Sequence, residues 1–315
     1  MLTTARVLST RLLQVIIVAL VVMIGTSLLV RLVPGDAART ILGDKASPGA
    51  LDALRQTLGL DRPIAEQIFI SIGRLVQGDL GTSFNFRGQT VTSLIVPALL
   101  VTACLAALAI LLSLLVGIPL GLGLALVRSS GADLLGRLSL TVLVALPSFM
   151  AGLILLYLVS IRLRIAPAGG WAGSWPSNFG YIWLPAVALS LYLGPLIART
   201  VRQAALETIQ QPFVEAARAR GVSRHRVIIC HVLPNAALPV IPLVGFNAGV
   251  MVSGAVTVEA IFALPGLGAQ LVQAMGTRDF PIVQGIALLT AVSVVVFNLL
   301  ADLLNLSVDP RLRSR

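Results

Sequence analysis

Charged residues are scarce in this chain of 315 residues. Only 11% are Asp, Glu, Lys or Arg, while 57% are hydrophobic and the mean hydropathy is +0.96. So little charge excludes an ordinary soluble domain and a disordered chain. The composition therefore indicates a protein embedded in a membrane.

Lysine and cysteine are nearly absent. The single lysine, Lys45, follows Asp44, so the chain has no P-loop, which needs a lysine directly after a glycine. Cys104 and Cys230 are too few for a disulfide framework. Neither His225 nor His231 completes a zinc site with Cys230, and no nucleophile motif or carboxylate pair appears. We therefore predict no catalytic residue, no metal and no cofactor in this chain, which is not expected to be an enzyme.

Six long apolar runs are present, each near or above the about 20 residues that a helix needs to cross a bilayer. They are Leu12–Val33, Pro97–Val127, Leu138–Ile161, Phe179–Ala198, Val232–Val258 and Ile282–Ala301. The first is too long for the core of a signal peptide and no A-x-A site follows it, so we expect an uncleaved span. The predicted fold is all-α, a polytopic membrane protein with six transmembrane helices.

Arginines set the predicted orientation. With both termini inside, thirteen of them fall in the inner segments and three in the short outer loops, as the positive-inside rule requires. This bias explains most of the net charge of +10 without any nucleic acid. The predicted divisions are 1–33 (N-terminus and first span), 34–96 (a large outer loop) and 97–315 (the remaining membrane region, which includes the inner loop 199–233). In the outer loop we expect a turn at 34–36, a helix from Ser47-Pro48 to near Gly59, and a second helix after Pro63.

Proline and glycine are frequent inside the predicted spans. Among the prolines are Pro119 in the second run and Pro147, Pro185, Pro195, Pro239 and Pro242 in later runs. Gly117/Gly121 and Gly245/Gly249 have the G-x-x-x-G spacing of closely packed helices. The 31-residue run Pro97–Val127 must tilt, kink or project, and its glycines mark the expected place. Tight packing and a bundle that bends to open a pathway both remain open.

Acids near the membrane are few. Glu259 lies at the expected outer end of the fifth span and Asp302 at the inner end of the sixth. Intramembrane acids are candidates for function, so Glu259 is a candidate outer gate or contact for an outer partner, and Asp302 a local ion pair. Asn247, between Gly245 and Gly249, is a candidate for the pathway. Water or arginine at the span ends offers a purely structural alternative.

The inner loop 199–233 contains a short helix with clear boundaries. Pro212 suits a first helical position, and Gly221 suits a left-handed residue after the last turn. Ser223 can cap the next helix, which continues through Leu233-Pro234 into the fifth span. Phe213, Ala216, Ala217 and Arg220 share one predicted face, whose alanines would permit close approach by a partner's groove. The alternative is a solvated basic loop.

This loop resembles the EAA loop of ABC importer permeases. Glu215-Ala216-Ala217, Gly221 and Leu233-Pro234 have that motif's spacing, and His231 departs from it at a usually aliphatic position. Further stretches are similar to the dipeptide/oligopeptide/nickel branch. They are Leu58–Pro63, Gly78–Gly81, His231–Asn235, Glu259–Phe262, Pro265–Gly268, Arg278–Pro281 and Asp309–Arg311. The likeness runs from the first span to the C-terminus.

The resemblance implies a permease subunit in a bacterial inner membrane that carries di- or oligopeptides, nickel or similar small solutes. The short inner helix would be a coupling helix, with Phe213, Glu215, Ala216, Ala217, Arg220 and Gly221 at the ATPase contact. The implied partners are a second homologous permease, two cytoplasmic ABC ATPases that carry ATP and Mg²⁺, and an extracytoplasmic binding protein.

Three other functions fit the sequence less well. A self-sufficient secondary transporter or channel predicts coupling-ion acids in mid-span, and none is seen. A membrane enzyme lacks its catalytic groups. A DNA-binding regulator would have to use 213–233 as a helix-turn-helix while held at a membrane with only a short loop free.

Overall fold

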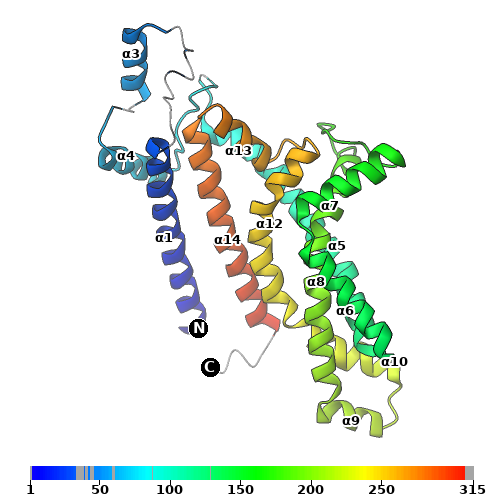
Figure 1. Cartoon of the computed structure of the whole chain (residues 1–315). Helices are drawn as coiled ribbons and strands as arrows, with labels where there is room; N and C mark the ends of the chain where they lie inside the picture. The colour runs from blue at the N-terminus through cyan, green and yellow to red at the C-terminus, as the bar shows by residue number, and fades with distance from the viewer. Residues whose placement is uncertain are drawn as a thin grey trace. The chain divides into compact units, whose positions relative to one another are not determined.

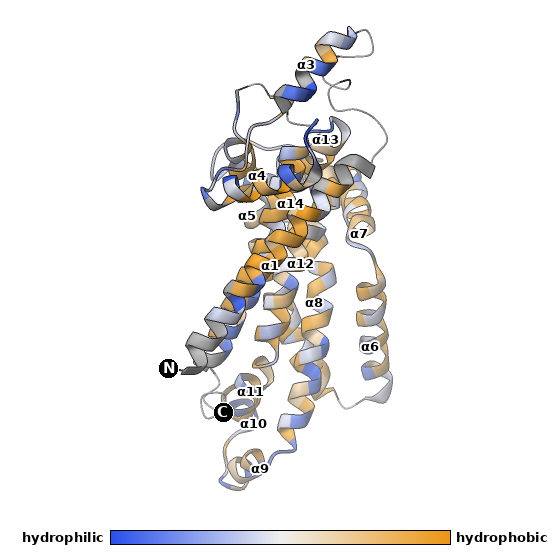
Figure 2. Cartoon of the chain, turned by 90° about the vertical axis from the view of Figure 1, so that its left-hand side faces the viewer, coloured by the Kyte–Doolittle hydropathy of each residue, from blue (hydrophilic) through white to orange (hydrophobic). Residues whose placement is uncertain are grey.

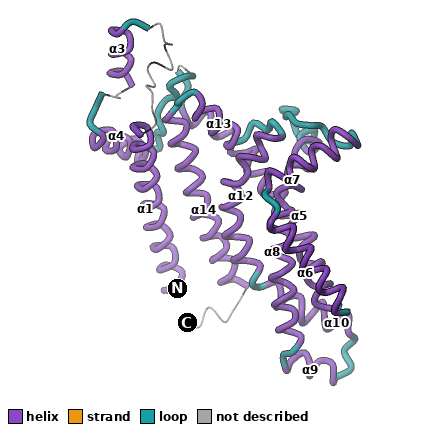
Figure 3. Tube along the Cα trace, viewed as in Figure 1, coloured by secondary structure: helices purple, strands orange, loops and turns teal. Residues whose placement is uncertain are grey.

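Nearly all of the described chain is helical (Figures 1 and 3). The computed structural model describes residues 2–32, 39, 42, 46–58, 61–86, 88–127 and 129–308. Within these ranges no strand forms, and an isolated antiparallel bridge joins Thr82 to Thr90. The all-α prediction is confirmed there. The expected turn at 34–36, the helix end at Gly59, Lys45, Arg128 and the C-terminal arginines lie outside the described residues.

The chain forms a series of helices of very different lengths. In chain order they are α1 (Leu2–Leu32), α3 (Pro48–Leu58), α4 (Ile64–Val76), α5 (Val91–Leu126), α6 (Ser130–Ala145), α7 (Ser148–Leu155), the π-helix η1 (Leu156–Arg162), α8 (Phe179–Ile209), α9 (Pro212–Ala219), α10 (Arg224–Val227), the π-helix η2 (Ile228–Val232), α11 (Leu233–Ala237), α12 (Val240–Ile261), α13 (Leu267–Gly276) and α14 (Phe280–Val308). Both helices expected in the outer loop are present, as α3 and α4.

Among the described residues, four helices are long and apolar enough to cross a membrane as single straight spans. These stretches are Ser9–Thr26, Val91–Leu126, Phe179–Ile209 and Phe280–Asn305. Two bent helix pairs raise the number to six if each pair counts as one span. The long helices α5, α12 and α14 are hydrophobic along most of their length, whereas hydrophilic residues gather on the part of α8 that leads to α9 (Figure 2).

The third apolar run is not one straight helix. It bends by 97° between Ser130–Ala145 and Ser148–Arg162. The break is at Leu146, which is extended (φ −75°, ψ 115°) and precedes Pro147. A proline disfavours helical geometry in the residue before it and has no N–H to continue the helix. The apolar pattern of Leu138–Ile161 therefore hides a sharp bend.

Four other span prolines divide into two groups. Pro185 and Pro195 are buried inside the uninterrupted helix α8. Pro239 is the residue before α12, where the fifth run bends by 47°, and Pro242 lies in the first turn of α12. Proline at a helix start costs no internal hydrogen bond, so Pro239 and Pro242 need no compensation, whereas the pair in α8 frees carbonyls that neighbouring groups must satisfy.

The chain divides into two compact units, 1–102 with 265–295 and 103–264 with 296–315. In the first unit α1 packs against α4, and the start of α5 packs against α13 and the start of α14. This second cluster is built from Val91, Ile95, Ala98, Leu267, Ala274, Ile282 and Ile286. Two polar contacts reinforce it: the Leu267 N–H donates to Thr102 Oγ1 (2.9 Å), and the Gln270 side-chain amide donates to the Leu94 carbonyl (2.9 Å).

Helix α8 is the centre of the second unit. It packs against α6, α7, α11 and α12, and α12 also packs against α7. Its buried face includes Leu193, Ile197, Val201 and Ala205. Beyond Ile209 the chain turns into α9, which lies past the end of α8 and beside α10 (Figure 1).

Glycines on α5 mark a close helix contact within this unit. A Cβ on Gly117 would lie 2.7 Å from the Gly194 carbonyl oxygen, and one on Gly121 would lie 2.3 Å from that of Ala198. Helix α5 continues without interruption through both positions. This G-x-x-x-G pair therefore brings α5 against α8, as the packing interpretation predicts.

Candidate functional site

The inner-loop helix α9 begins where the sequence predicts. Gln211 is extended (φ −77°, ψ 144°), and Pro212 occupies the first turn of α9. The Gln211 carbonyl accepts from the N–H groups of Val214 (3.0 Å) and Glu215 (3.3 Å). Proline forces the preceding residue out of helical geometry, so it ends the long helix α8 and fixes the start of an independent short helix.

The end of α9 depends on Gly221. Its φ is +79°, in the left-handed region that the sequence predicts for it. The Gly221 N–H donates to the Arg218 carbonyl (2.9 Å), and the Val222 N–H donates to that of Ala217 (3.2 Å). A Cβ added at Gly221 would meet nothing within 4 Å. Backbone conformation alone, rather than lack of space, therefore calls for glycine here.

The chain then enters a second helical stretch. Ser223 precedes α10 in extended geometry (φ −59°, ψ 146°), although its side chain makes no capping hydrogen bond. α10 continues through η2 into α11, where Pro234 lies in the first turn. The predicted path through Leu233-Pro234 toward α12 is confirmed.

One side of α9 is buried against its own chain. Val214 and Ala217 are 0% and 1% exposed, so both side chains pack inside this chain. Ala217 is therefore buried within this chain, whereas the sequence places it on the predicted contact face with Phe213, Ala216 and Arg220. Phe213 remains 43% exposed, and Ala216 and Arg220 are exposed as well.

The position of the free face follows from helix geometry. At about 100° per residue, Val214 and Ala217 define one side of α9. The opposite side carries Glu215, Ala216 and Ala219, all exposed. Phe213 and Arg220 flank the buried side, and the Arg220 Nε donates to the Ala216 carbonyl of its own helix (3.3 Å). The exposed surface therefore carries the small side chains of Ala216 and Ala219, with an aromatic ring at one edge.

Both pathway candidates are buried within the second unit. Asn247 is 3% exposed, and its side-chain amide donates to the Leu243 carbonyl one turn earlier (2.8 Å). Glu259 is 0% exposed, near the end of α12. A side chain this deeply buried in the chain does not present itself to a binding protein in this conformation.

The cysteine and the histidines of the inner loop differ in their exposure. Cys230 and His225 are exposed, and His231 is half-buried. In the part of the chain that the structure describes, no group of three or more His, Cys, Asp or Glu side chains is placed to hold a metal ion.

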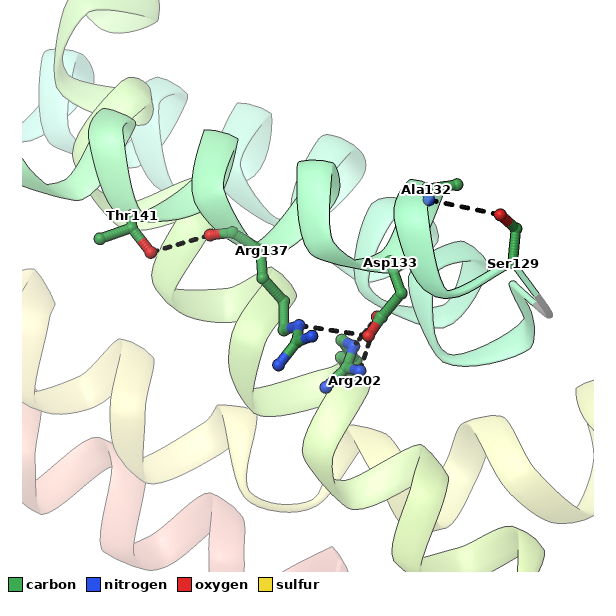
Figure 4. Close-up of polar contacts among 6 residues, drawn as sticks. All are labelled: Ser129, Ala132, Asp133, Arg137, Thr141 and Arg202. Carbon is green, nitrogen blue, oxygen red and sulfur yellow. Dashed lines mark hydrogen bonds and ion pairs between the residues drawn. The ribbon is translucent and has the colours of Figure 1, made fainter.

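A polar contact between α6 and α8 was missed by sequence reasoning (Figure 4). Asp133 Oδ1 accepts from Arg202 Nε (3.0 Å) and Nη2 (2.6 Å), and its other oxygen faces Arg137 Nε at 3.1 Å. Ser129 caps α6 by accepting from the Ala132 N–H (3.5 Å). One feature of the sequence indicates that Asp133 has a partner: it is the single acid between Asp79 and Glu207.

Comparison with known proteins identifies the family. Residues 117–314 match the model for the binding-protein-dependent transport system inner membrane component, and residues 4–106 match that for the N-terminal part of such a component. The chain belongs to this family. It is a multi-pass permease subunit of an ABC importer and not itself an enzyme.

Sequence similarity to known relatives extends over nearly the whole permease. A glutathione transport system permease protein of Pectobacterium atrosepticum is 33% identical over 306 residues, covering 96% of this chain and 97% of the relative. A protein of Brucella abortus (strain 2308), provisionally named a peptide transport system permease, is 39% identical over 307 residues, covering 96% and 97%. The match includes α9 and its flanking turns.

Solved structures share the permease's fold. An inward-facing structure of the MetNI methionine ABC transporter superposes with a TM-score of 0.58 at 19% identity, covering 69% of this chain and 97% of that chain. An amino acid ABC transporter crystallised with histidines gives a TM-score of 0.50 at 21% identity, covering 68% and 94%. At these identities the likeness bears on the fold alone.

Proposed function

We propose that the permease forms half of a translocation pathway for di- or oligopeptides or similar small solutes, driven by separate cytoplasmic ATPase chains. The observation that carries the coupling is α9, an eight-residue helix set apart by Pro212 and the left-handed Gly221. The substrate class rests on the names of the relatives, which transport glutathione or, by provisional name, peptides.

The two sides of α9 have different roles in the proposed coupling. Val214 and Ala217 anchor the helix to its own chain, so a push on the free side moves the permease rather than detaching the helix. The small Ala216 and Ala219 side chains allow a groove to approach the backbone closely, and Phe213 offers an aromatic anchor at the edge. ATP and Mg²⁺ would be bound by the ATPases, and an extracytoplasmic protein would deliver substrate.

A second, homologous permease would complete the pathway. Asn247 and Glu259 remain our candidates for its lining and outer gate, exposed only when the helices around them rearrange. Their burial in this conformation fits a pathway that is closed here.

The proposed topology has six spans in a bacterial inner membrane, with both termini cytoplasmic. It counts each bent pair, α6 with α7 and α10–α11 with α12, as one span. Thiol labelling in intact cells tests it, after Cys104 and Cys230 are replaced by serine. Phe69→Cys on α4 should react with an impermeant reagent from outside, whereas Ala216→Cys should react only after permeabilisation. Labelling of Ala216→Cys in intact cells would reverse the orientation.

Protection by the ATPase tests the coupling site. Maleimide labelling of Ala216→Cys should fall when the purified ATPase is added, because the partner covers the free side of α9. Phe69→Cys is the matched exposed control and should label equally with and without ATPase. Equal labelling of Ala216→Cys in both conditions would contradict docking at α9.

Transport itself is measured in proteoliposomes that hold the full complex. Uptake of labelled di- and oligopeptides should require ATP and the binding protein, and Ni²⁺ uptake assayed in parallel separates the two substrate classes. Uptake that persists without ATP would sink the proposal and favour a gradient-driven carrier.

A further inference from the structure

Asp133 holds α6 and α8 together near the end of α8 that leads to α9. Arg202 forms two hydrogen bonds to one of its carboxylate oxygens, at 3.0 and 2.6 Å. On the same two helices, the Arg199 guanidinium donates to the Thr141 hydroxyl. Figure 4 shows Asp133 on α6 facing Arg202 on α8.

This ion pair is unlike a solvated surface pair. The side chains of Arg202 and Asp133 are only 19% and 20% exposed, whereas that of Arg137 is 53% exposed. Surface pairs contribute little because water and salt screen them, but a partly buried pair with a two-pronged guanidinium contact is stronger and fixes geometry. Without Asp133, Arg137 and Arg202 would face each other as like charges.

The position of the pair in the chain suggests its purpose. Arg199 and Arg202 lie on the uninterrupted helix α8, whose last residue, Ile209, is separated from α9 by two residues. On the other helix, Asp133 lies in the first turn of α6, and α6 ends at the 97° bend before Pro147. A displacement of α9 that is passed on through this two-residue connection would travel along α8 to Arg202, and from Asp133 along α6 to the bend.

We propose that Asp133 fastens α6 to α8 so that both move as one body when α9 is displaced. In this role Asp133 is a positioning residue for coupling, and the inference rests on the proposed function of α9. The opposite arrangement, a lock that must open in every transport cycle, predicts the reverse outcome in the crosslinking test below.

Substitution tests the fastening. Asp133→Asn should leave ATP hydrolysis by the complex near wild type and lower the substrate transported per ATP by about fivefold or more, a typical size for a coupling energy. Arg137→Gln is the matched control, because it removes the exposed partner and keeps the contact between helices; its ratio should stay near wild type. The charge swap Asp133→Arg with Arg202→Asp should restore most of the ratio. An unchanged ratio in Asp133→Asn overturns the proposal.

Crosslinking gives a second test that does not depend on how well Asp133→Asn folds. In a permease with Cys104 and Cys230 replaced by serine, Thr141→Cys and Arg199→Cys are joined by a short bis-maleimide. Helices that move as one body should still transport when joined, at a rate near that of the unjoined double variant. Loss of transport on joining shows that the helices must slide, and overturns the proposal.

Failure of the proposed function would look different. A wild-type complex without ATP-dependent uptake contradicts the importer role of α9 itself. A wild-type complex that transports, together with Asp133→Asn at an unchanged ratio, contradicts the fastening alone.

Discussion

Asp279 and Ser83 are 196 positions apart in the chain, yet the Ser83 hydroxyl donates a hydrogen bond to the Asp279 carboxylate. The N–H groups of Phe84 and Asn85 donate to the same carboxylate, each at 3.1 Å. Asp279 is 1% exposed. One buried acid just before α14 therefore organises the loop that leads into α5, and both segments belong to the first unit.

We expect Asp279→Asn to loosen this loop. An amide nitrogen cannot accept hydrogen bonds, so at least one buried donor loses its partner, at a cost of about 2 kcal/mol in the free energy of unfolding. Hydrogen exchange of residues 83–86 should accelerate, and the thermal midpoint in detergent should fall. The control is Asp79→Asn, because Asp79 is exposed and accepts from Gly81 N–H (2.8 Å) within its own turn. Identical exchange in both variants would contradict the role of Asp279.

The close contact of α5 with α8 gives a second prediction, on stability. Gly121→Ala should destabilise the permease by about 2 kcal/mol or more, since its Cβ would lie 2.3 Å from the Ala198 carbonyl oxygen and overpacking strains both helices. Gly123→Ala is the matched control on the same helix, because its Cβ would meet nothing within 4 Å. That variant should be neutral or slightly stabilising, by up to about 1 kcal/mol. Thermal unfolding in detergent compares the two, and equal midpoints would refute the close packing.

Local sequence signals predicted the features that depend on neighbouring residues. The boundaries of α9 follow from Pro212 and Gly221, whose effects act on the backbone beside them. The α4 helix after Pro63 follows from an apolar stripe at helical period. The apolar runs likewise located the long helices, because a bilayer demands length and hydrophobicity and little else.

Contacts between distant segments could not be predicted in this way. The burial of Ala217 depends on the elements that pack against α9, which helical period does not reveal. The pairs Asp133 with Arg202 and Ser83 with Asp279 join positions 69 and 196 residues apart. The bend at Pro147 was hidden because the apolar run Leu138–Ile161 continues across it, although the proline itself was a visible warning.

The exposed ring of Phe213 gives a prediction on partner binding. Phe213→Ala should weaken binding of the purified ATPase by about 2 kcal/mol, or roughly 30-fold in Kd, as expected for an aromatic anchor in a helix groove. Phe69→Ala on α4 removes an equally large and more exposed ring (80%) from a segment proposed to lie outside the membrane, and should leave Kd unchanged. Binding can be titrated with the permease in nanodiscs. A Phe213→Ala variant with wild-type affinity would remove Phe213 from the contact.

Gly221 allows backbone conformation to be separated from side-chain bulk. Its φ of +79° costs a residue with a Cβ about 1–2 kcal/mol, and a β-branched residue suffers most, while Asn tolerates this region. Because a Cβ there meets no atom within 4 Å, no clash of the Cβ within this chain is expected, and the comparison of Val with Asn separates the turn from the added side chain. Gly221→Val should insert normally but lose about tenfold or more of ATP-driven uptake, since the direction in which α9 leaves its turn would change. Gly221→Asn should retain most of the uptake. Equal uptake by Gly221→Val and the wild type would show that coupling does not need the left-handed turn, and equal loss in both variants would assign the defect to the added side chain instead.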